Sequence, residues 1–224
     1  MPDPNYVIEM IESALFAQNC YVLRRKGSTQ AIVIDPGFDT RAILDLLRRE
    51  GLTPAAILNT HGHADHIAGN AAIKAAFPDA PLWIGVNDGP LLTDPEANLS
   101  RPFGQDLVSP PADRLLLHGE TIDVAGFRFE VREIPGHSPG SVVFIDRDED
   151  PALAFVGDVL FAGSVGRTDL GGDGPGLLAG IKARLLDLPD DTLVFSGHGP
   201  LTTIGAERRT NPFVGEQPGA YRLD

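Results

Sequence analysis

Side chains of the kind that bind metal ions follow four apolar segments of this sequence, each at the start of a Gly-containing loop. Residues 55–60 run directly into the cluster His61-Gly62-His63-Ala64-Asp65-His66. Residues 130–135, 152–157 and 192–197 are followed, directly or after one glycine, by His137, Asp158 and His198. Short apolar runs bounded by turn residues predict buried strands. We therefore expect four strand ends to deliver these side chains to one rim of the fold, held as rigidly as a metal site requires.

The spacing inside the first cluster indicates two metal positions. His61 and His63 lie two residues apart in an extended loop and can point to one ion, whereas the adjacent Asp65 and His66 turn toward a second. Asp158 has two carboxylate oxygens and suits a bridge between two cations. One ion is expected on His61, His63, His137 and Asp158, and its neighbour on Asp65, His66, Asp158 and His198. Nitrogen and oxygen ligands without sulfur suit two divalent ions, with zinc expected first and iron or manganese as alternatives.

The remaining polar candidates have plainer interpretations. His118 stands alone and is interpreted as an ordinary hydrogen-bonded residue. Cys20 is the only cysteine, which excludes an intramolecular disulfide and a multi-cysteine zinc site, and it is interpreted as a buried strand residue.

Composition limits the partners. The chain has 31 Asp and Glu against 18 Lys and Arg, and its net charge of −13 argues against nucleic acid or an anionic membrane surface as partner. No window approaches the roughly 20 apolar residues of a membrane helix. The start MPDPNY has no secretory signal, so the cytoplasm is the expected location. The partner is expected to be a small molecule, and monomer and homo-oligomer both stay open.

The order of elements predicts an α+β fold. Strands are expected at 6–11, 19–25, 31–35, 55–60 and 81–86, and a β-meander is expected over 113–157, with a last strand at 192–197. Helices are expected from an N-cap at Asp39 to about residue 50, over 66–77, and over 176–188 with Leu178, Ile181, Leu185 and Leu186 on one side. Two face-to-face sheets with helices outside, an αββα sandwich, would bury both sets.

The length of 224 residues fits a single domain over 1–224, with a tail after about residue 211 that wraps the surface. The Pro-, Asp- and Gly-rich stretch 87–111 is expected to be an irregular excursion that serves as a lid or substrate loop.

Four stretches resemble the metallo-β-lactamase superfamily and, within it, the compact single-domain glyoxalase II-like hydrolases. They are THGHADHIAGN at 60–70, IPGHSPGSVVF at 134–144, FVGDVLFAGSVGRTDL at 155–170 and FSGHGPLTTIGAERRTNPF at 195–213. The resemblance spans about residues 5–213 and implies the αββα fold, two metals on the seven residues above, and Asp158 as the bridging carboxylate. An aspartate there, in place of cysteine, is unlike the β-lactamases that name the superfamily.

The resemblance implies a hydrolase that cleaves an acyl thioester such as S-lactoylglutathione with a metal-bridging hydroxide. Asp65 is expected to orient the water and accept its proton, and Asp35 or Asp169 to support the site. Two-domain glyoxalase II enzymes bind glutathione partly through a helical C-terminal domain, for which this chain has no room.

Arginines after the ligands offer substrate contacts. Arg167, with Thr168 beside it, is expected either to contact a substrate carboxylate or to form a salt bridge with a neighbouring aspartate. Arg208 and Arg209 are expected on a solvated helix face, with contacts to an anionic substrate as the alternative.

Other functions fit the pattern less closely. Persulfide dioxygenases resemble the chain in THxHADH and GRTD but use one iron, on the residues that correspond to His61, His137 and Asp158. RNA or phosphodiester cleavage is opposed by the charge of −13. A purely structural metal role is opposed by the ligand set, because structural zinc sites are usually closed and rich in sulfur.

Overall fold

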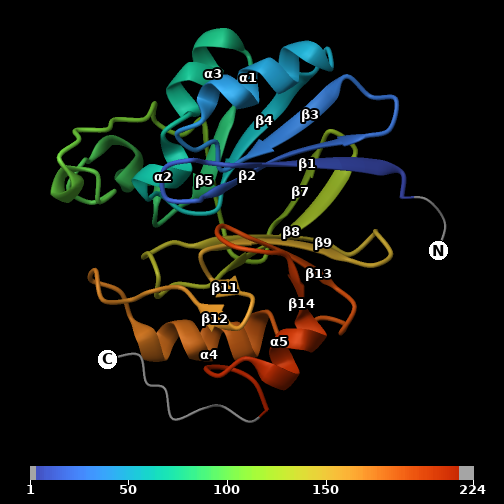
Figure 1. Ribbon diagram of the computed structural model, residues 1–224, viewed down its shortest axis with the longest axis vertical. Coiled ribbons are helices and arrows are strands. Elements are labelled where there is room, and N and C mark those ends of the chain that lie inside the picture. Colours follow the sequence, from blue (N-terminus) through green and yellow to red (C-terminus); the bar gives the residue numbers. More distant parts are fainter. Residues whose placement is uncertain (1–3, 217–224) are drawn as a thin grey trace.

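A computed structural model describes residues 4–216, and within them two six-stranded sheets face each other (Figure 1). The first sheet has the order β1 (Tyr6–Glu12), β2 (Asn19–Arg25), β3 (Gln30–Ile34), β4 (Thr53–Asn59), β5 (Leu82–Gly85) and β6 (Arg114–Leu116). Its first three strands are antiparallel, and β3 to β6 are parallel. The carboxyl ends of the parallel strands therefore meet at one edge of the sheet.

The second sheet runs β14 (Thr202–Thr203), β13 (Leu193–Ser196), β10 (Leu153–Gly157), β9 (Val142–Asp146), β8 (Phe127–Glu133) and β7 (Thr121–Val124). Strands β7 to β10 form the predicted antiparallel meander, and β13 pairs with β10 in parallel. A small hairpin that the sequence did not predict, β11 (Leu160–Phe161) with β12 (Ser164–Val165), follows β10.

Helices cover the outer face of each sheet (Figure 1). The helices α1 (Thr40–Arg49) and α3 (Asn70–Ala76) lie on the first sheet, and α4 (Gly174–Arg184) and α5 (Ile204–Thr210) lie on the second. Short turns of helix occur at α2 (Ala64–Ile67), η1 (Gly89–Thr93) and η2 (Arg101–Phe103). The predicted αββα sandwich is confirmed. None of the helices within residues 4–216 combines the length and apolar character needed to cross a bilayer.

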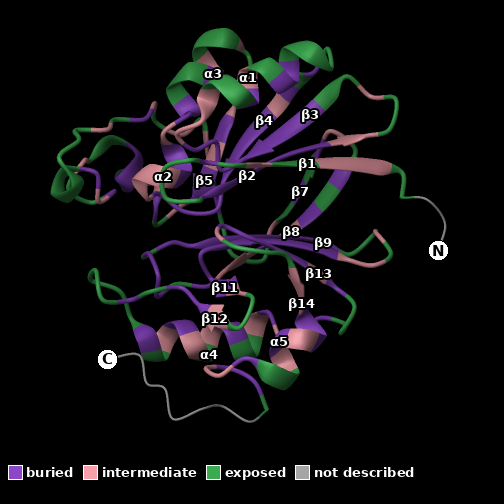
Figure 2. Cartoon of the chain, in the orientation of Figure 1, coloured by how far each residue is buried: buried purple, intermediate pink, exposed green. Residues whose placement is uncertain are grey.

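The core between the sheets is rich in phenylalanine, and Figure 2 shows both sheets buried along most of their length. Phe129 lies against both Phe144 and Phe155 at centroid separations of 6.1 Å. Burying one such ring contributes about 1.5–3 kcal/mol. The strands that carry the site loops are therefore anchored from both sides.

Strand β4, which leads into the loop of His61 and His63, is held firmly in the first sheet. Residues 55–58 of β4 are half-buried to fully buried and pair with β3 on one side and β5 on the other. Cys20 on β2 is buried, as predicted. The backbone that ends at residue 59 is held on both sides, so the loop that follows starts from a fixed point.

Two local predictions were wrong. The segment 113–118 was assigned to the meander, but β6 pairs in parallel with β5 in the first sheet. The helix predicted over 66–77 is divided into α2 and α3, because the Asn59 side chain donates to the His66 carbonyl at 3.0 Å and the Gly69 N–H donates to the Pro36 carbonyl at 2.7 Å. A side chain at Gly69 would collide with that backbone, at 2.8 Å from the Pro36 oxygen.

Helix ends also differ from the prediction. Asp39 occupies the N-cap position of α1, but its carboxylate accepts a hydrogen bond from the Ala14 N–H instead of capping the helix. Helix α4 ends at Arg184 and buries Leu177 with Ile181, while Leu178 is only partly buried. Of the tail predicted after residue 211, the part beyond residue 216 lies outside the described residues.

Candidate metal centre

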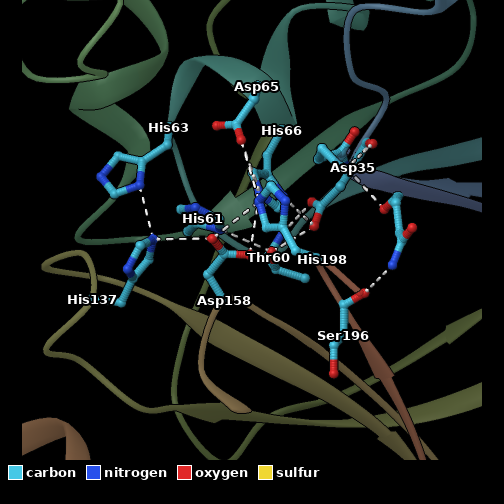
Figure 3. Close-up of polar contacts among 12 residues, drawn as sticks. Asp35, Thr60, His61, His63, Asp65, His66, His137, Asp158, Ser196 and His198 are labelled. Carbon is cyan, nitrogen blue, oxygen red and sulfur yellow. Dashed lines mark hydrogen bonds and ion pairs between the residues drawn. The ribbon is translucent and has the colours of Figure 1, made fainter. Parts of the chain in front are cut away.

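The seven predicted ligands meet at one edge of the sandwich, between the two sheets (Figure 3). The loop after β4 carries His61 and His63, and α2 carries Asp65 and His66. The loops after β8, β10 and β13 supply the other three, which are His137, Asp158 and His198. His118 lies elsewhere, where its Nδ1 accepts a hydrogen bond from the Glu133 N–H. The predicted convergence of strand ends is what the structure shows.

Three histidines form the first group. The ligand atoms of His61, His63 and His137 all lie within 4.8 Å of one another. The Nδ1 of His63 is 3.0 Å from the Nε2 of His137, and that Nε2 is 3.5 Å from Oδ2 of Asp158. Two ring nitrogens and a carboxylate oxygen thus face one small space, which is the geometry of a cation site.

The second group consists of Asp65, His66 and His198, whose ligand atoms also lie within 4.8 Å of one another. The Nε2 of His198 is 3.3 Å from Oδ2 of Asp65 and 3.4 Å from Oδ2 of Asp158. The Nε2 of His66 is 3.3 Å from Oδ1 of Asp158. Asp158 therefore contacts histidines of both groups, as a bridging carboxylate would.

Outer hydrogen bonds fix how the rings point. The Nδ1 of His137 donates to the Arg167 carbonyl at 2.8 Å, and the Nδ1 of His198 donates to the Phe16 carbonyl at 3.0 Å. The Nδ1 of His66 lies 3.0 Å from Oδ2 of Asp35. In a neutral ring, as a metal ligand must be, a partner that accepts the proton of one nitrogen leaves the other nitrogen with a free electron pair. In all three rings that other nitrogen is the Nε2 that faces the site.

Asp35 plays the supporting part that the sequence left open between Asp35 and Asp169. Its two oxygens accept the Thr60 N–H at 2.7 Å and the Thr60 hydroxyl at 2.6 Å, besides facing His66. It lies within metal-binding distance of His61 and His66, but its oxygens are already occupied, so it orients a ring instead. Asp169 lies on the exposed side, paired with Arg167.

Asp88 is a part of this region that the sequence did not reveal. Its buried carboxylate accepts the Gly62 N–H at 2.8 Å, in the loop between His61 and His63. It also accepts the Ser138 hydroxyl at 2.7 Å and the Gly140 N–H at 2.6 Å, just after His137. One side chain thus ties together two loops that carry candidate ligands. Burial raises the pKa of Asp88, and the three donors work against that rise.

The residues fit a bound cation. The Nε2 of His61 is buried and has no hydrogen-bond partner, and the Nε2 of His66 and Oδ1 of Asp158 face each other without a well-formed hydrogen bond. Leaving such atoms unsatisfied costs about 1–3 kcal/mol each. A cation at this place would satisfy all three. The set of histidine nitrogens and carboxylate oxygens, without sulfur, suits zinc, iron or manganese.

The charges of the side chains point the same way. Burial lowers the pKa of His61 well below its usual range, and burial together with His137 lowers the pKa of His63 to about 3, so both rings are neutral ligands. Burial also disfavours a charged His198, but hydrogen bonds with Asp158 and Asp65 raise its pKa to about 9. The two carboxylates therefore attract positive charge to the second group, which a divalent cation would supply.

A cavity of about 430 Å³ opens beside these ligands and is lined by His63, Asp65, His137, Asp158 and His198 on one side. The predicted lid or substrate loop contributes Asn98, Leu99 and Phe103 to it. Arg167 also lines the cavity, but its guanidinium donates to both oxygens of Asp169 at 2.7 Å. Of the two alternatives for Arg167, the structure shows the salt bridge.

The other predicted substrate contacts lie away from this cavity. Thr168 is buried and does not line it. Arg208, expected on a solvated helix face, is bound instead to the carbonyls of Leu186 at 2.7 Å and Leu188 at 2.6 Å. Arg209 lies 3.2 Å from Asp190. These arginines hold α5 to the turn after α4.

Residues 14–198 match the family model described as the metallo-β-lactamase superfamily. The chain belongs to this superfamily. A probable metallo-hydrolase of Bacillus subtilis, YqgX, is 41% identical over 83% of this chain and 87% of its own length. The hydroxyacylglutathione hydrolase GloC of Haemophilus influenzae is 35% identical over 92% of this chain and 97% of its own length.

Two solved structures of this superfamily fold are similar over nearly the whole chain. The B3 metallo-β-lactamase BLEG-1 is 43% identical, with a TM-score of 0.87 over 93% of this chain and 99% of its own. The protein TTHA1623, crystallised in a di-iron-bound form, is 39% identical, with a TM-score of 0.77 over 92% of this chain and 99% of its own. Together with the paired His and Asp groups, these matches make the chain a metal-dependent hydrolase.

Proposed function

We propose that the chain hydrolyses an acyl thioester, of the class to which S-lactoylglutathione belongs, at a site for two metal ions. The observation that carries this proposal is the position of Asp158 between the two histidine groups, within 3.5 Å of His137 and 3.4 Å of His198. The similarity to GloC over most of both chains supports the substrate class.

The residues that would hold the ions are His61, His63 and His137 for one, Asp65, His66 and His198 for the other, and Asp158 for both. Divalent ions in such a pair lower the pKa of water toward neutrality and polarise a carbonyl. The expected first choice is zinc, with iron and manganese as alternatives.

Asp65 is the proposed catalytic residue. It lines the cavity, and its Oδ2 faces the Nε2 of His198 at 3.3 Å. Burial alone would raise the pKa of Asp65, but His66 and His198 lower it, so the group is a carboxylate at neutral pH. A carboxylate at this edge of the cavity can orient a water and accept its proton.

The leaving group favours a thioester. A thiol has a pKa near 8.5, so a thiolate departs from the tetrahedral intermediate without a strong general acid. An alkoxide or an amine would need a proton donor. Against the effect of burial, His66 holds the pKa of Asp158 well below its usual range, so Asp158 is a poor donor at neutral pH, and Asp65 could return only the proton that it takes from the water.

Persulfide oxidation at a single iron is the alternative. It needs only the positions of His61, His137 and Asp158. The structure brings the second group, Asp65, His66 and His198, together equally well. A complete second group favours a metal pair, and with it hydrolysis.

The test combines metal analysis with a substrate panel. Two ions per chain and anaerobic cleavage of glutathione and coenzyme A thioesters are the expected results. One iron per chain with oxygen consumption on glutathione persulfide would favour the oxygenase. The panel also includes a β-lactam. Cleavage of the β-lactam alone, with no thioester cleaved, would overturn the thioester proposal.

A substitution tests the role of Asp65. Asp65→Ala should lower kcat by about 10²–10⁴-fold, the usual contribution of a general base. The matched control is Asp45→Ala, because Asp45 lies on α1 with an exposed side chain, and its contacts with Arg41 and Arg48 lie at the surface. A wild-type rate and wild-type metal content in Asp65→Ala would contradict the assignment.

A further inference from the structure

The cavity beside the candidate metal centre is lined by apolar as well as by charged side chains. We call the apolar part of this surface the apolar wall; it consists of Phe16, Leu99, Phe103, Phe161, Val165 and Leu170. These residues come from the loop after β1, the excursion between β5 and β6, the β11–β12 hairpin and the loop before α4. Phe161 packs edge-on to His198 at a centroid separation of 6.0 Å, so the wall begins directly beside a candidate ligand.

Large rings of this wall are open to solvent. Phe103 is 60% exposed and Phe16 is 46% exposed, and Leu170, which also lines the cavity, is 46% exposed. Phe16 lies edge-on to Phe103 at 5.8 Å and also contacts Phe38 at 5.9 Å. Clustered exposed apolar side chains around a cavity mark a ligand-binding surface, because the ligand removes them from water.

The wall is built into the fold. Phe16 and Leu99 both have backbone φ angles in the left-handed region, +69° and +65°, which non-glycine residues adopt at a cost. The Phe16 carbonyl accepts the Nδ1 of His198, and the neighbouring Asn98 side chain donates to the Leu107 carbonyl at 2.9 Å. These hydrogen bonds anchor the backbone at Phe16 and the residue that precedes Leu99.

Apart from the candidate ligand His198, the described residues that line the cavity include no cationic side chain without a carboxylate partner. The one arginine there, Arg167, is neutralised by its two hydrogen bonds to Asp169. Asp65 and Asp158 also line the cavity, and the chain as a whole carries −13. An anionic group placed on the apolar wall, away from the candidate ligands, would lose water and meet no unpaired cationic side chain.

We infer that the apolar wall binds an uncharged, apolar arm of the substrate, such as a medium-length alkyl or an aromatic group next to the scissile carbonyl. This inference rests on the proposed hydrolysis and narrows it: among thioesters, those with an apolar arm are preferred over those with a charged or hydroxylated one. The arm belongs either to the acyl group or to the thiol, and the experiment below distinguishes these two sources.

Binding tests the inference without turnover. Metal-loaded protein is titrated by calorimetry with non-hydrolysable thioethers of N-acetylcysteamine, an uncharged thiol, that carry hexyl, ethyl or 5-carboxypentyl groups. Affinity should fall about four-fold for each methylene removed from hexyl, as for a buried CH₂. The carboxypentyl compound should bind at least about ten-fold more weakly than the hexyl compound. Equal or tighter binding of the acid, or no binding of either, would overturn the inference.

Variants locate the effect. Leu170→Ala and Phe103→Ala should reduce the hexyl preference, because both side chains lie on the apolar wall. Leu117→Ala is the matched control, since Leu117 is an exposed leucine outside the cavity, at 57% exposure. An equal loss in Leu117→Ala would show that the effect is not specific to the wall.

Turnover then separates the two proposals. Hexanoyl, lactoyl and acetyl thioesters of N-acetylcysteamine test an acyl-side arm, and acetyl thioesters of hexanethiol and of glutathione test a thiol-side arm. A higher kcat/KM for the apolar member of one series assigns the arm to that side. Tight hexyl binding with no thioester cleaved would refute the proposed function alone. Thioester cleavage without apolar preference in either series would refute the inference alone.

Discussion

Asp88 is the residue whose substitution tests most directly how the ligand loops are held. Its carboxylate is fully buried, and it joins the loop around Gly62 to the loop that contains Ser138 and Gly140. The perturbation is Asp88→Asn, which keeps the shape of the side chain and exchanges one oxygen for an NH₂ group.

The expected cost follows from the three hydrogen bonds. In the variant, the amide oxygen of the new side chain can keep the bonds from Gly62 and Ser138, but its NH₂ group then faces the Gly140 N–H, donor against donor. One buried N–H left unsatisfied costs about 1–3 kcal/mol, and two charge-assisted bonds become neutral ones at about 1 kcal/mol each. Burial of the charge, which raises the pKa of Asp88, offsets part of this loss. We expect a net destabilisation of about 2–4 kcal/mol.

Two measurements on the same variant check this reasoning. Urea unfolding at a fixed metal concentration should show a lower midpoint with an unchanged slope. Competition with a chelator should show weaker metal binding, because the bond from Gly140 is lost and the two that still join the loops of His61 and His137 become weaker. Ser138→Ala is the milder comparison, since it leaves both backbone donors to Asp88 in place. A stability change below about 0.5 kcal/mol with unchanged metal affinity would refute the argument.

Three further predictions concern the rest of the molecule. Burial would raise the pKa of Glu130, but Arg132 and Arg147 lower it below 4.5. The ionised Glu130 therefore stabilises the folded protein at pH values above about 4.5, and this contribution is lost as the pH falls. The difference in unfolding free energy between wild type and Glu130→Gln should be under about 1 kcal/mol at pH 7, because the pair is partly exposed, and should disappear in acid; a difference that grows in acid would contradict the sign. Cys20 is buried, and burial raises the pKa of its thiol, so thiol reagents should label it only in denaturant; labelling of the native protein at the rate of a free thiol would show that the strand opens. Phe129→Ala should lower the free energy of unfolding, measured in urea, by about 3–5 kcal/mol. A smaller loss would mean that the two sheets move together and fill the space left by the ring.

The candidate ligands were predictable because the loops that carry them start directly, or after one glycine, at the end of an apolar run. His61, His137 and His198 come from three different strands, yet each belongs to a short buried run that ends in a Gly-containing loop. Two local properties, an apolar run and the type of residue that follows it, were sufficient to find the candidate ligands. The convergence followed from sheet geometry, because the strand ends share one edge.

The supporting residues depend on contacts that local patterns do not contain. Asp88 lies 26 residues from Gly62 and 50 from Ser138, and in the sequence it looks like an ordinary turn aspartate before a glycine. Asp35 offered a signal, since it directly follows β3 just as the ligands follow their strands. The same pattern that found the ligands therefore also indicated Asp35, but not whether it binds metal or orients a ring.

The misplaced strand has a similar origin. Three residues, Arg114–Leu116, form β6, and a run this short carries no information about its partner. Its parallel pairing with β5 was decided by the excursion between them, which returns the chain to the first sheet. The divided helix 66–77 likewise depended on side-chain and backbone contacts with residues 36 and 59, which periodicity does not show.

One hydrogen bond joins the apolar wall to the candidate metal centre. The Phe16 carbonyl fixes the ring of His198, while the Phe16 side chain forms part of the wall. Because the bond uses the backbone, a change of the side chain at this position alters the wall without removing the partner of His198. Phe16 has a left-handed backbone conformation, in which its carbonyl binds His198 and its ring lines the cavity. From the proposed role of the apolar wall, we expect a substitution of the Phe16 side chain to change substrate preference while the hydrogen bond to His198 stays in place.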